Sequence, residues 1–336
     1  MEFIINEKDS GMNIKDFIKR EVNPSRKLLS QTKNKPDGIL VNGEHVTVRY
    51  ILKAGDVLNF NYINYAGIHD APEANADLLE LVDIIYEDEY ILCVNKPSDM
   101  PSHPSFNHLN DTLANAVAAY YNKQNKMIRF HPVNRLDRNT SGLVLIAKDR
   151  LISPKLNALI KNGAIKKVYT AIVLGDFNSI VTRHSALDAE SHEIAGQARN
   201  DLVAGILEYN NASKTGRITA PIKRDPDSII KRMCADDGDY ALTDFKFIKS
   251  NGEISLLEVY PLTGRTHQIR VHFHALGFAL LGDDLYYDCP EIAEKYNIKR
   301  HALHAVSLEF EHPASKSNIK IACDLPEDMR SIIKIL

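Results

Sequence analysis

The chain has 336 residues, of which 44% are hydrophobic and 25% charged, as is typical of a globular protein with room for about two domains. A formal net charge of −3 argues against a uniformly basic nucleic-acid binder. No apolar run is long enough to span a membrane, and the charged start MEFIINEKDS is unlike a secretory signal. We therefore expect a cytoplasmic protein with no membrane partner and four reduced thiols, Cys93, Cys234, Cys289 and Cys323.

The charge is distributed unevenly along the chain. Residues 1–64 carry a net charge of +2, residues 65–89 carry −8, and residues 90–336 carry +3. The negative net charge of the chain therefore comes from one acidic segment, and the regions on either side of it are slightly basic. We interpret residues 65–80 as a linker between a small first domain, residues 1–64, and a larger domain, residues 81–336.

The first domain is expected to be a small α+β unit. GMNIKDFIKREV places apolar residues at helical spacing, and NPSRKLLSQTKN reads as a second, basic helix. The following stretch predicts short strands with a turn at Asn42–Gly43. From the charges alone, the second helix is equally well suited to gripping RNA phosphates and to keeping the domain in solution. Its basic residues are Arg26, Lys27, Lys33 and Lys35.

The larger domain is dominated by short apolar strands, with helical stretches between some of them. The strands do not alternate regularly with helices, so we expect an α+β domain with a mixed, mainly antiparallel sheet. Residues 178–216 fit poorly, because they are weakly periodic and long for a connection within a compact domain. We interpret them as an insertion, with a short extra helix over residues 187–198 as the alternative.

A single carboxylate stands out in HPVNRLDRNTSGLVLIAKD, residues 131–149. Asp137 lies between Arg135 and Arg138, and a carboxylate held near guanidinium groups is expected to stay ionised at neutral pH. Such a group suits a nucleophile or a base. Taken alone, however, this stretch is more typical of a salt-bridged turn.

A second polar cluster lies in LTGRTHQIRVHFHALGFALLGDDLYY, residues 262–287. A zinc site built on His267, His272 and His274 is one interpretation, but the spacing matches no standard zinc pattern. We therefore expect no metal, and instead a cluster that binds phosphates and a polar substrate. Its candidate groups are Arg265, His267, Gln268 and Arg270.

The stretch RLISPKLNALIKNGAIKKVYT contains five basic residues and no acidic one. It predicts a basic helix followed by a strand that carries Tyr169, whose ring could stack on an exposed base or simply fill the core. The sequence has no P-loop, no GxGxxG after a strand, no GxSxG and no HExxH. We therefore expect no nucleotide, flavin or metal cofactor.

Taken together, these stretches resemble the motifs of one family, the pseudouridine synthases of the RluA type. IIYEDEYILCVNKPSDMPSHPS resembles the opening motif, NRLDRNTSGLVLIAKD the catalytic motif, and KKVYTAIVLG the strand that carries the active-site tyrosine. GRITAPIKR, the 262–287 stretch and RHALHAVSLEFEHP are similar to later motifs in the same order. Residues 1–64 resemble, more loosely, the S-four-like RNA-binding domain that often precedes this catalytic domain.

The resemblance implies an enzyme that isomerises specific uridines to pseudouridine, with large-subunit (23S) ribosomal RNA as the expected substrate. Asp137 would be the nucleophile or the base, Arg270 would pair with and orient it, and Tyr169 would pack against the target base and take part in proton movement. The protein would act as a monomer without a small-molecule cofactor. Residues expected to contact RNA are Arg26, Lys27, Arg135, Arg138, Lys166, Lys167, Arg265, His267 and Gln268.

Three other functions stay open from the sequence. They are a non-catalytic RNA-binding or ribosome-assembly protein on the same fold, a synthase that acts on transfer RNA, and a metal hydrolase built on His272 and His274. The joint presence of Asp137, Tyr169 and Arg270 favours the enzyme over the pure binder. One departure concerns Asn134, which replaces the histidine usual before the motif's arginine; we expect activity to survive with an altered RNA contact.

Overall fold

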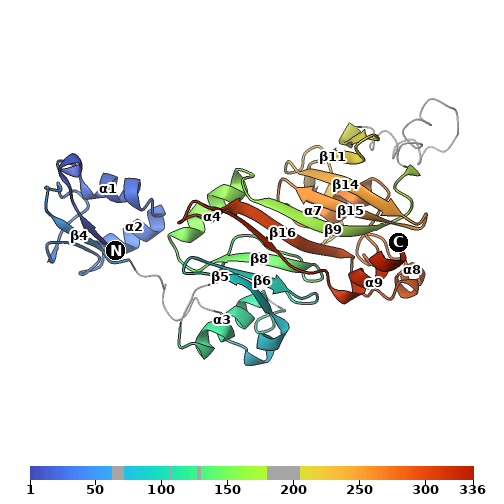
Figure 1. The fold of residues 1–336 in the computed structure, drawn as a ribbon, viewed down its shortest axis with the longest axis horizontal. Coiled ribbons are helices and arrows are strands. Elements are labelled where there is room, and N and C mark those ends of the chain that lie inside the picture. The colour runs from blue at the N-terminus through green and yellow to red at the C-terminus, as the bar shows by residue number, and fades with distance from the viewer. Residues whose placement is uncertain (63–71, 106, 127–129, 180–204) are drawn as a thin grey trace.

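The computed structural model describes residues 1–62, 72–105, 107–126, 130–179 and 205–336. The chain forms a small N-terminal unit and a larger region built on one extensive sheet (Figure 1). The N-terminal sheet has the order β1-β4-β2-β3 and is antiparallel throughout. Its strands are β1 (Glu2–Ile4), β2 (Ile39–Val41), β3 (Glu44–His45) and β4 (Val57–Phe60).

Capping residues fix both helices of the N-terminal unit. The side chain of Asn13 accepts the Asp16 amide at the start of α1 (Ile14–Glu21), and Ser25 accepts the Leu28 amide at the start of α2 (Arg26–Lys33). Between β2 and β3, Asn42 and Gly43 both have positive φ, as the tight turn predicted from Asn-Gly requires. The apolar faces of the helices and the sheet form a separate core, which includes Ile14, Phe17, Ile18, Leu28, Ile39, Leu58 and Phe60.

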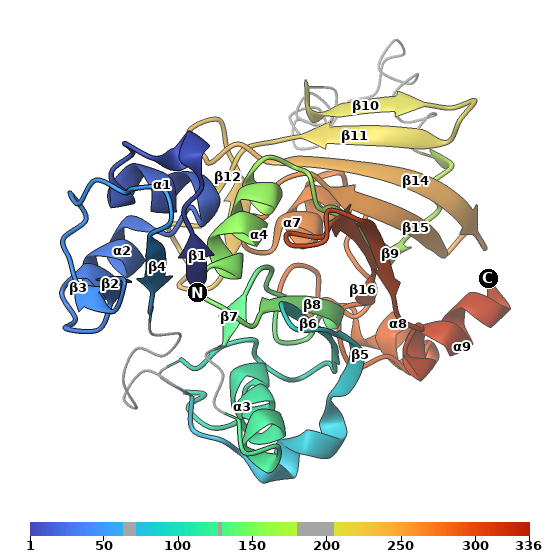
Figure 2. The same ribbon diagram turned by 60° about the vertical axis from the view of Figure 1, so that its left-hand side comes forward.

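The N-terminal unit contacts the larger region around one turn. The Tyr62 hydroxyl donates to Asp149 over 2.7 Å, and Arg150 donates to the Gln31 side chain over 2.7 Å. Leu151 completes the apolar core of the N-terminal unit. Figures 1 and 2 show this unit beside α4 (Ile152–Lys161), which begins directly after these residues.

Within the described residues, the larger sheet has eleven strands in the order β10-β11-β14-β15-β9-β16-β8-β6-β5, with β17 and β7 paired to β16 and β8. The pair β8–β16 is parallel and the others are antiparallel, so the expected mixed, mainly antiparallel sheet is confirmed. A separate hairpin joins β12 (Ile222–Arg224) to β13 (Arg232–Cys234). The large sheet comprises β5 (Asp83–Glu87), β6 (Ile91–Lys96), β7 (His131–Pro132), β8 (Ser141–Ala147), β9 (Lys166–Leu174), β10 (Leu207–Asn210), β11 (Thr215–Thr219), β14 (Leu242–Ser250), β15 (Ile254–Pro261), β16 (Leu303–Glu311) and β17 (Asn318–Ala322).

Helices cover both faces of the large sheet. All seven residues of β8 are buried: Val144 and Ile146 join one core with residues of α3 and α7, while Leu143 and Leu145 join another with α4. This alternation follows from the two-residue period of a strand. No helix among the described residues is long and apolar enough to cross a membrane. The remaining helices are α3 (Leu113–Lys123), α7 (Gln268–Ala275), α8 (Pro290–Lys295), α9 (Glu327–Ile335) and the 3₁₀ helices Glu7–Asp9 and Ala76–Leu81.

Two expected boundaries change. The linker proposed for residues 65–80 falls partly on 63–71, outside the described residues, and its end belongs to the 3₁₀ helix Ala76–Leu81. The insertion proposed for 178–216 is too long at its C-terminal end, because β10 and the start of β11 belong to the large sheet. Residues 180–204, including the alternative helix over 187–198, lie outside the described residues.

Gly142 allows β8 and β16 to approach closely. Its φ is +114°, and a Cβ added there would lie 2.5 Å from the backbone nitrogen of Ala305 and closer still to its carbonyl oxygen. These two residues are partners in the parallel ladder. A side chain at position 142 would therefore force the two strands apart.

We predict that Gly142→Ala lowers the free energy of unfolding by about 3 kcal/mol or more, because overpacking adds about 1–3 kcal/mol to the strain of a positive φ. Gly252→Ala is the matched control, since Gly252 has φ +92° and no heavy atom near an added Cβ. The free energy of unfolding of the control should fall only by the backbone strain of an alanine at positive φ, about 1–2 kcal/mol. Urea denaturation of both variants measures the difference, and equal losses would contradict the proposed clash.

Candidate active site

Asp137 lies on a turn that leads directly into β8. The Thr140 amide donates to the Asp137 carbonyl over 3.1 Å and closes the turn, and β8 begins at Ser141. On the preceding side, the Ser102 hydroxyl donates to the Leu136 carbonyl and accepts the Leu136 amide, over 2.8 and 3.2 Å. The backbone on either side of Asp137 is thus held by hydrogen bonds.

Lys96, the last residue of β6, fixes the same turn. Its side chain is fully buried, and its Nζ donates to the carbonyls of Pro97, Met100 and Arg138 over 2.7, 2.8 and 3.0 Å. Three acceptors match the three donors of an ammonium group. Lys96 therefore ties the loop after β6 to the backbone of the residue that follows Asp137.

Two histidines before and within β16 hold the other side of the turn. His301 Nε2 lies 2.7 Å from the Thr140 hydroxyl, and His304 Nδ1 lies 2.8 Å from the Ser141 hydroxyl. Burial lowers the pKa of His301 well below its usual value and that of His304 to about 4, so both rings are neutral at pH 7. These neutral rings fix the turn without adding charge beside Asp137.

Asn134 does not point freely toward a substrate. Its side-chain amide donates to the Leu143 carbonyl over 3.0 Å, and its side-chain oxygen accepts the Leu145 amide over 2.8 Å. The side chain thereby continues the ladder that β7 makes with β8. Asn134 holds the strand leading to Asp137, although it also lines the cavity described below.

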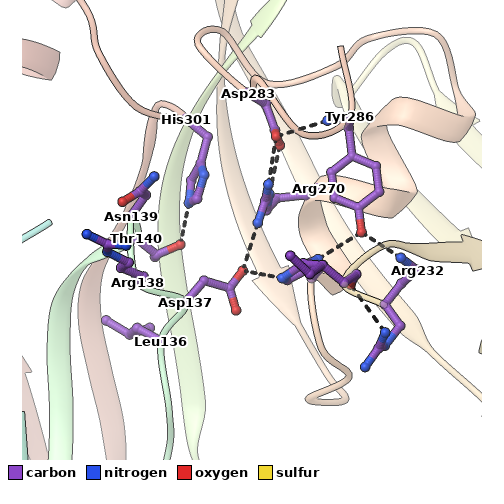
Figure 3. Close-up of polar contacts among 12 residues, drawn as sticks. Leu136, Asp137, Arg138, Asn139, Thr140, Arg232, Arg270, Asp283, Tyr286 and His301 are labelled. Carbon is purple, nitrogen blue, oxygen red and sulfur yellow. Dashed lines mark hydrogen bonds and ion pairs between the residues drawn. The ribbon is translucent and has the colours of Figure 1, made fainter. Parts of the chain in front are cut away.

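Arg270, on α7, faces Asp137 (Figure 3). His267, which immediately precedes this helix, also faces the carboxylate. Arg270 Nη1 lies 3.6 Å and His267 Nε2 lies 4.0 Å from the Oδ2 atom of Asp137. Within the described part of the chain, the ion pairs of Asp137 run to these residues and not to the neighbouring arginines. The expectation that Arg135 and Arg138 hold the carboxylate is therefore wrong, and Arg138 instead pairs with Asp99 over 2.7 Å.

Tyr169 reaches the same place from β9. Cross-strand pairing puts Gly142, Ala305 and Tyr169 in one row across β8, β16 and β9. The side chain is 8% exposed, and burial together with the negative charge of Asp137 raises the pKa of Tyr169. The phenol therefore keeps its proton at neutral pH.

A cavity of about 620 Å³ opens over these groups. This volume falls in the range of small-molecule sites, and the Asp137 side chain that faces it is 29% exposed. The wall combines apolar groups with a ring of cationic ones, which suits a nucleotide. Its polar lining includes Asn134, Arg135, Asp137, Arg138, Lys167, Tyr169, Arg265, His267, Gln268 and Arg270.

The two lysines at the start of β9 separate, because successive strand residues point to opposite faces. Lys167 lines the cavity and donates to the Thr263 carbonyl over 3.0 Å, and burial lowers its pKa to about 8. Lys166 does not line the cavity but is exposed and pairs with Glu309 over 3.3 Å. The expected contact of Lys166 with the substrate at this cavity is therefore not supported.

Gln268 has a different role from the one expected. It is buried, its side-chain oxygen accepts from the Thr263 hydroxyl and the Arg265 amide, and its side-chain nitrogen donates to the Leu242 carbonyl and the Thr243 hydroxyl. All four hydrogen-bonding positions of the amide are thus occupied by protein. We therefore correct the expected RNA contact: Gln268 shapes the loop that carries Arg265.

The N-terminal unit has a second concave surface, here called the α2 groove, of about 530 Å³. Arg26 and Lys33 line it from one face of α2, while Lys27, which was also expected to bind RNA, is exposed on the helix but does not line the groove. Two further basic residues, Lys15 and Arg49, which were not among the expected RNA contacts, also line the groove. The lining residues are Asn13, Lys15, Arg26, Leu29, Ser30, Lys33, Val48, Arg49 and Ile51.

The histidines considered as zinc ligands do not converge. His272 is buried, with Nδ1 2.9 Å from the Thr243 hydroxyl and Nε2 3.0 Å from the Ala220 carbonyl. Its two nitrogens thus belong to the packing of α7 on the sheet. Among the residues that the structure describes, no group of three or more His, Cys, Asp or Glu side chains is placed to hold a metal ion.

Several residues of the site were not assigned a role from the sequence. Lys96, Ser102 and His301 hold the turn of Asp137, while Asp283 and Tyr286 contact its charge partners. Each lies in one of the stretches quoted for the family resemblance. Their position in these motifs was thus the signal that could have identified them, but only the fold shows which side chains they contact.

Comparisons with known proteins identify the family of this chain. Residues 90–275 match the family model described as RNA pseudouridylate synthase. The chain is 34% identical to the uncharacterized RNA pseudouridine synthase YjbO of Bacillus subtilis over 96% of this chain and 99% of the relative. It is 31% identical to ribosomal large subunit pseudouridine synthase D of Buchnera aphidicola, over 90% and 83% of the two chains.

The fold is also shared with a solved structure. Human RNA pseudouridylate synthase domain containing 4 superposes with a TM-score of 0.54 at 19% identity, covering 77% of this chain and 94% of that one. Asp137, Arg270, His267 and Tyr169 line one cavity, and the matched region, residues 90–275, spans them. The chain is a member of the RNA pseudouridylate synthase family.

Proposed function

We propose that this protein isomerises specific uridines of large-subunit ribosomal RNA to pseudouridine, with Asp137 as the reacting carboxylate. The observation that carries the proposal is the partly exposed Asp137 facing a nucleotide-sized cavity, with Arg270 and His267 on one of its oxygens. The reaction needs no second substrate, because uracil leaves the sugar and returns to the same sugar.

The reaction sets clear chemical demands on the site. The bond from uracil N1 to the sugar C1′ breaks, a bond from C5 to C1′ forms, the proton on C5 leaves, and N1 gains a proton. Asp137 can begin this sequence by attacking the sugar as a nucleophile or by removing a sugar proton as a base. The fixed turn of Asp137 supports both, since each needs a carboxylate held in place.

The surrounding groups suit a uridine turned out of its RNA stack. Flipping a nucleotide costs a few kcal/mol, which contacts to the extruded base and its phosphates must offset. Tyr169 lines the cavity wall, and in this proposal its ring packs against the base and its phenol takes part in proton movement. Arg135, Arg138, Lys167 and Arg265 bring positive charge to the cavity wall for the adjoining phosphates.

The ribosomal target is supported by relatives rather than by geometry. Two of them are named as ribosomal large subunit pseudouridine synthases D and C, from Buchnera aphidicola and Vibrio vulnificus. The α2 groove adds a second cationic surface, which suits a large folded RNA. Pseudouridine mapping of total RNA from cells with and without the gene tests the target. Loss confined to transfer RNA would refute the ribosomal assignment.

We predict that Asp137→Asn abolishes pseudouridine formation and leaves the affinity for RNA within about threefold, because the amide keeps the shape of the side chain but can neither attack nor accept a proton as a carboxylate does. Release of tritium from RNA labelled at C5 of uridine measures the reaction, and filter binding measures the affinity. Thermal unfolding checks that the variant is folded. Retained isomerisation would exclude Asp137 as the reacting group.

We predict that Arg26→Gln combined with Lys33→Gln weakens RNA binding and reduces the slope of log affinity against log salt by about 1.4 to 1.8, since each phosphate contact contributes about 0.7 to 0.9. Lys320→Gln with Lys334→Gln is the charge-matched control. Lys320 lies on β17 and Lys334 on α9, both exposed, and α9 lies far from α2 (Figure 1). Identical slopes for both pairs would rule out RNA contact at the α2 groove.

A further inference from the structure

Arg270 divides its guanidinium between two carboxylates. Its Nε and Nη2 donate to the two oxygens of Asp283 over 2.8 and 2.7 Å, while Nη1 faces Asp137. Asp283 is fully buried. Burial lowers the pKa of Arg270, but the hydrogen bonds to Asp283 outweigh that effect, so the pKa of Arg270 is raised. A two-pronged pair fixes the plane of a guanidinium. The direction of Nη1 is therefore set by Asp283.

Tyr286 holds the other group that faces Asp137. Its hydroxyl lies 2.8 Å from His267 Nδ1 and accepts the Arg232 amide over 3.0 Å (Figure 3). With the Arg232 amide donating to the hydroxyl, a hydroxyl proton directed at Nδ1 makes Nδ1 the acceptor. A neutral imidazole carries one proton, so that proton then lies on Nε2, the nitrogen that faces Asp137.

The backbone of His267 shows that its position is imposed. The residue has φ +58°, a left-handed conformation that is uncommon for residues other than glycine and that persists only where surrounding contacts enforce it. The Arg270 guanidinium also lies over the Tyr286 ring, with Cζ 5.0 Å from the centroid of the ring. One aromatic side chain thus contacts both donors.

Asp283 and Tyr286 form a single structural unit in the loop after α7. The Tyr286 amide donates to an Asp283 side-chain oxygen over 3.3 Å, and the Tyr287 amide donates to the Asp283 carbonyl over 2.9 Å. Arg270 and His267 both approach the same oxygen of Asp137, Oδ2. Among the described residues, Oδ1 of Asp137 is thereby left outside both ion pairs.

We propose that Asp283 and Tyr286 are positioning residues, which aim Nη1 of Arg270 and the Nε2 proton of His267 at Oδ2 of Asp137 so that Oδ1 reacts. This inference rests on the proposed function of Asp137. Neither residue lines the cavity, and each acts through a neighbour. Misplacement of a reacting group by about 1 Å costs on the order of 100-fold in rate.

The chain offers matched controls one residue away. Asp284 and Tyr287 are exposed neighbours of the buried Asp283 and the half-buried Tyr286. We compare Asp283→Asn with Asp284→Asn, and Tyr286→Phe with Tyr287→Phe. The probe is an unmodified large-subunit ribosomal RNA transcript with tritium at C5 of uridine, used at saturating concentration in single turnover.

The expected result is a loss of about 100-fold in the single-turnover rate for Asp283→Asn and about tenfold for Tyr286→Phe. The dissociation constant for RNA should stay within about twofold, because the variants affect chemistry rather than binding. Both control variants should match the wild type. Rates for Asp283→Asn and Tyr286→Phe equal to those of their controls, or losses confined to RNA affinity, would overturn the inference.

A double-mutant cycle separates positioning from general destabilisation. In a His267→Ala background, Tyr286→Phe should cause no further loss of rate, because its hydrogen-bond partner is gone; a further tenfold loss would refute the pathway through His267. This cycle keeps the inference testable even if Asp283→Asn does not fold. An inactive wild type would instead refute the proposed function, so the two failures are distinguishable.

Discussion

The parallel contact between β8 and β16 determines where every group of the site lies. It joins the β5–β8 half of the sheet to the half that contains β9, β14 and β15. The absence of a side chain at Gly142 lets the two strands meet, and the same cross-strand row continues to Tyr169. The turn carrying Asp137 thus lies beside Tyr169, although the two residues are separated by a helix in the sequence. A displacement of this ladder would move the carboxylate and the phenol relative to each other.

The site places charge at the edge of the core and compensates for it locally. Asp283 and Arg270 are both buried, an arrangement tolerated only when the ions are paired and hydrogen-bonded. Their pairing leaves one guanidinium nitrogen for Asp137, so the carboxylate that faces the cavity has a cation whose orientation is already fixed. Electrostatic groups fixed before the substrate arrives do not have to reorganise during the reaction.

Much of the local structure could be predicted from the sequence. Apolar spacing and capping residues indicated both N-terminal helices, Asn42–Gly43 indicated a turn, and irregular strand order indicated a mainly antiparallel sheet. The phase of β9 was also available in principle: Lys167 and Tyr169, two residues apart, share a face, whereas Lys166 points the other way. Charge alone groups the two lysines, whereas the two-residue period of a strand separates them.

Pairing between distant side chains could not be predicted in this way. Arg135 and Arg138 were close to Asp137 in sequence, yet the cation beside it is Arg270, which α7 delivers from more than a hundred residues away. Gln268 looked like a polar ligand because the sequence does not reveal that four protein groups surround its amide. Sequence patterns report the period of an element, whereas such contacts depend on how elements pack.

The attachment of the N-terminal unit near Asp149 has a consequence for substrate capture. If the α2 groove and the cavity both engage one RNA, the second contact becomes intramolecular and is governed by an effective concentration. Each surface can then be individually weak. In that case, weak binding at the cavity would let a modified nucleotide leave readily, while the groove would keep the RNA associated. The hydrogen bonds from Tyr62 to Asp149 and from Arg150 to Gln31 would then fix the position of the α2 groove relative to the cavity, on which the effective concentration depends.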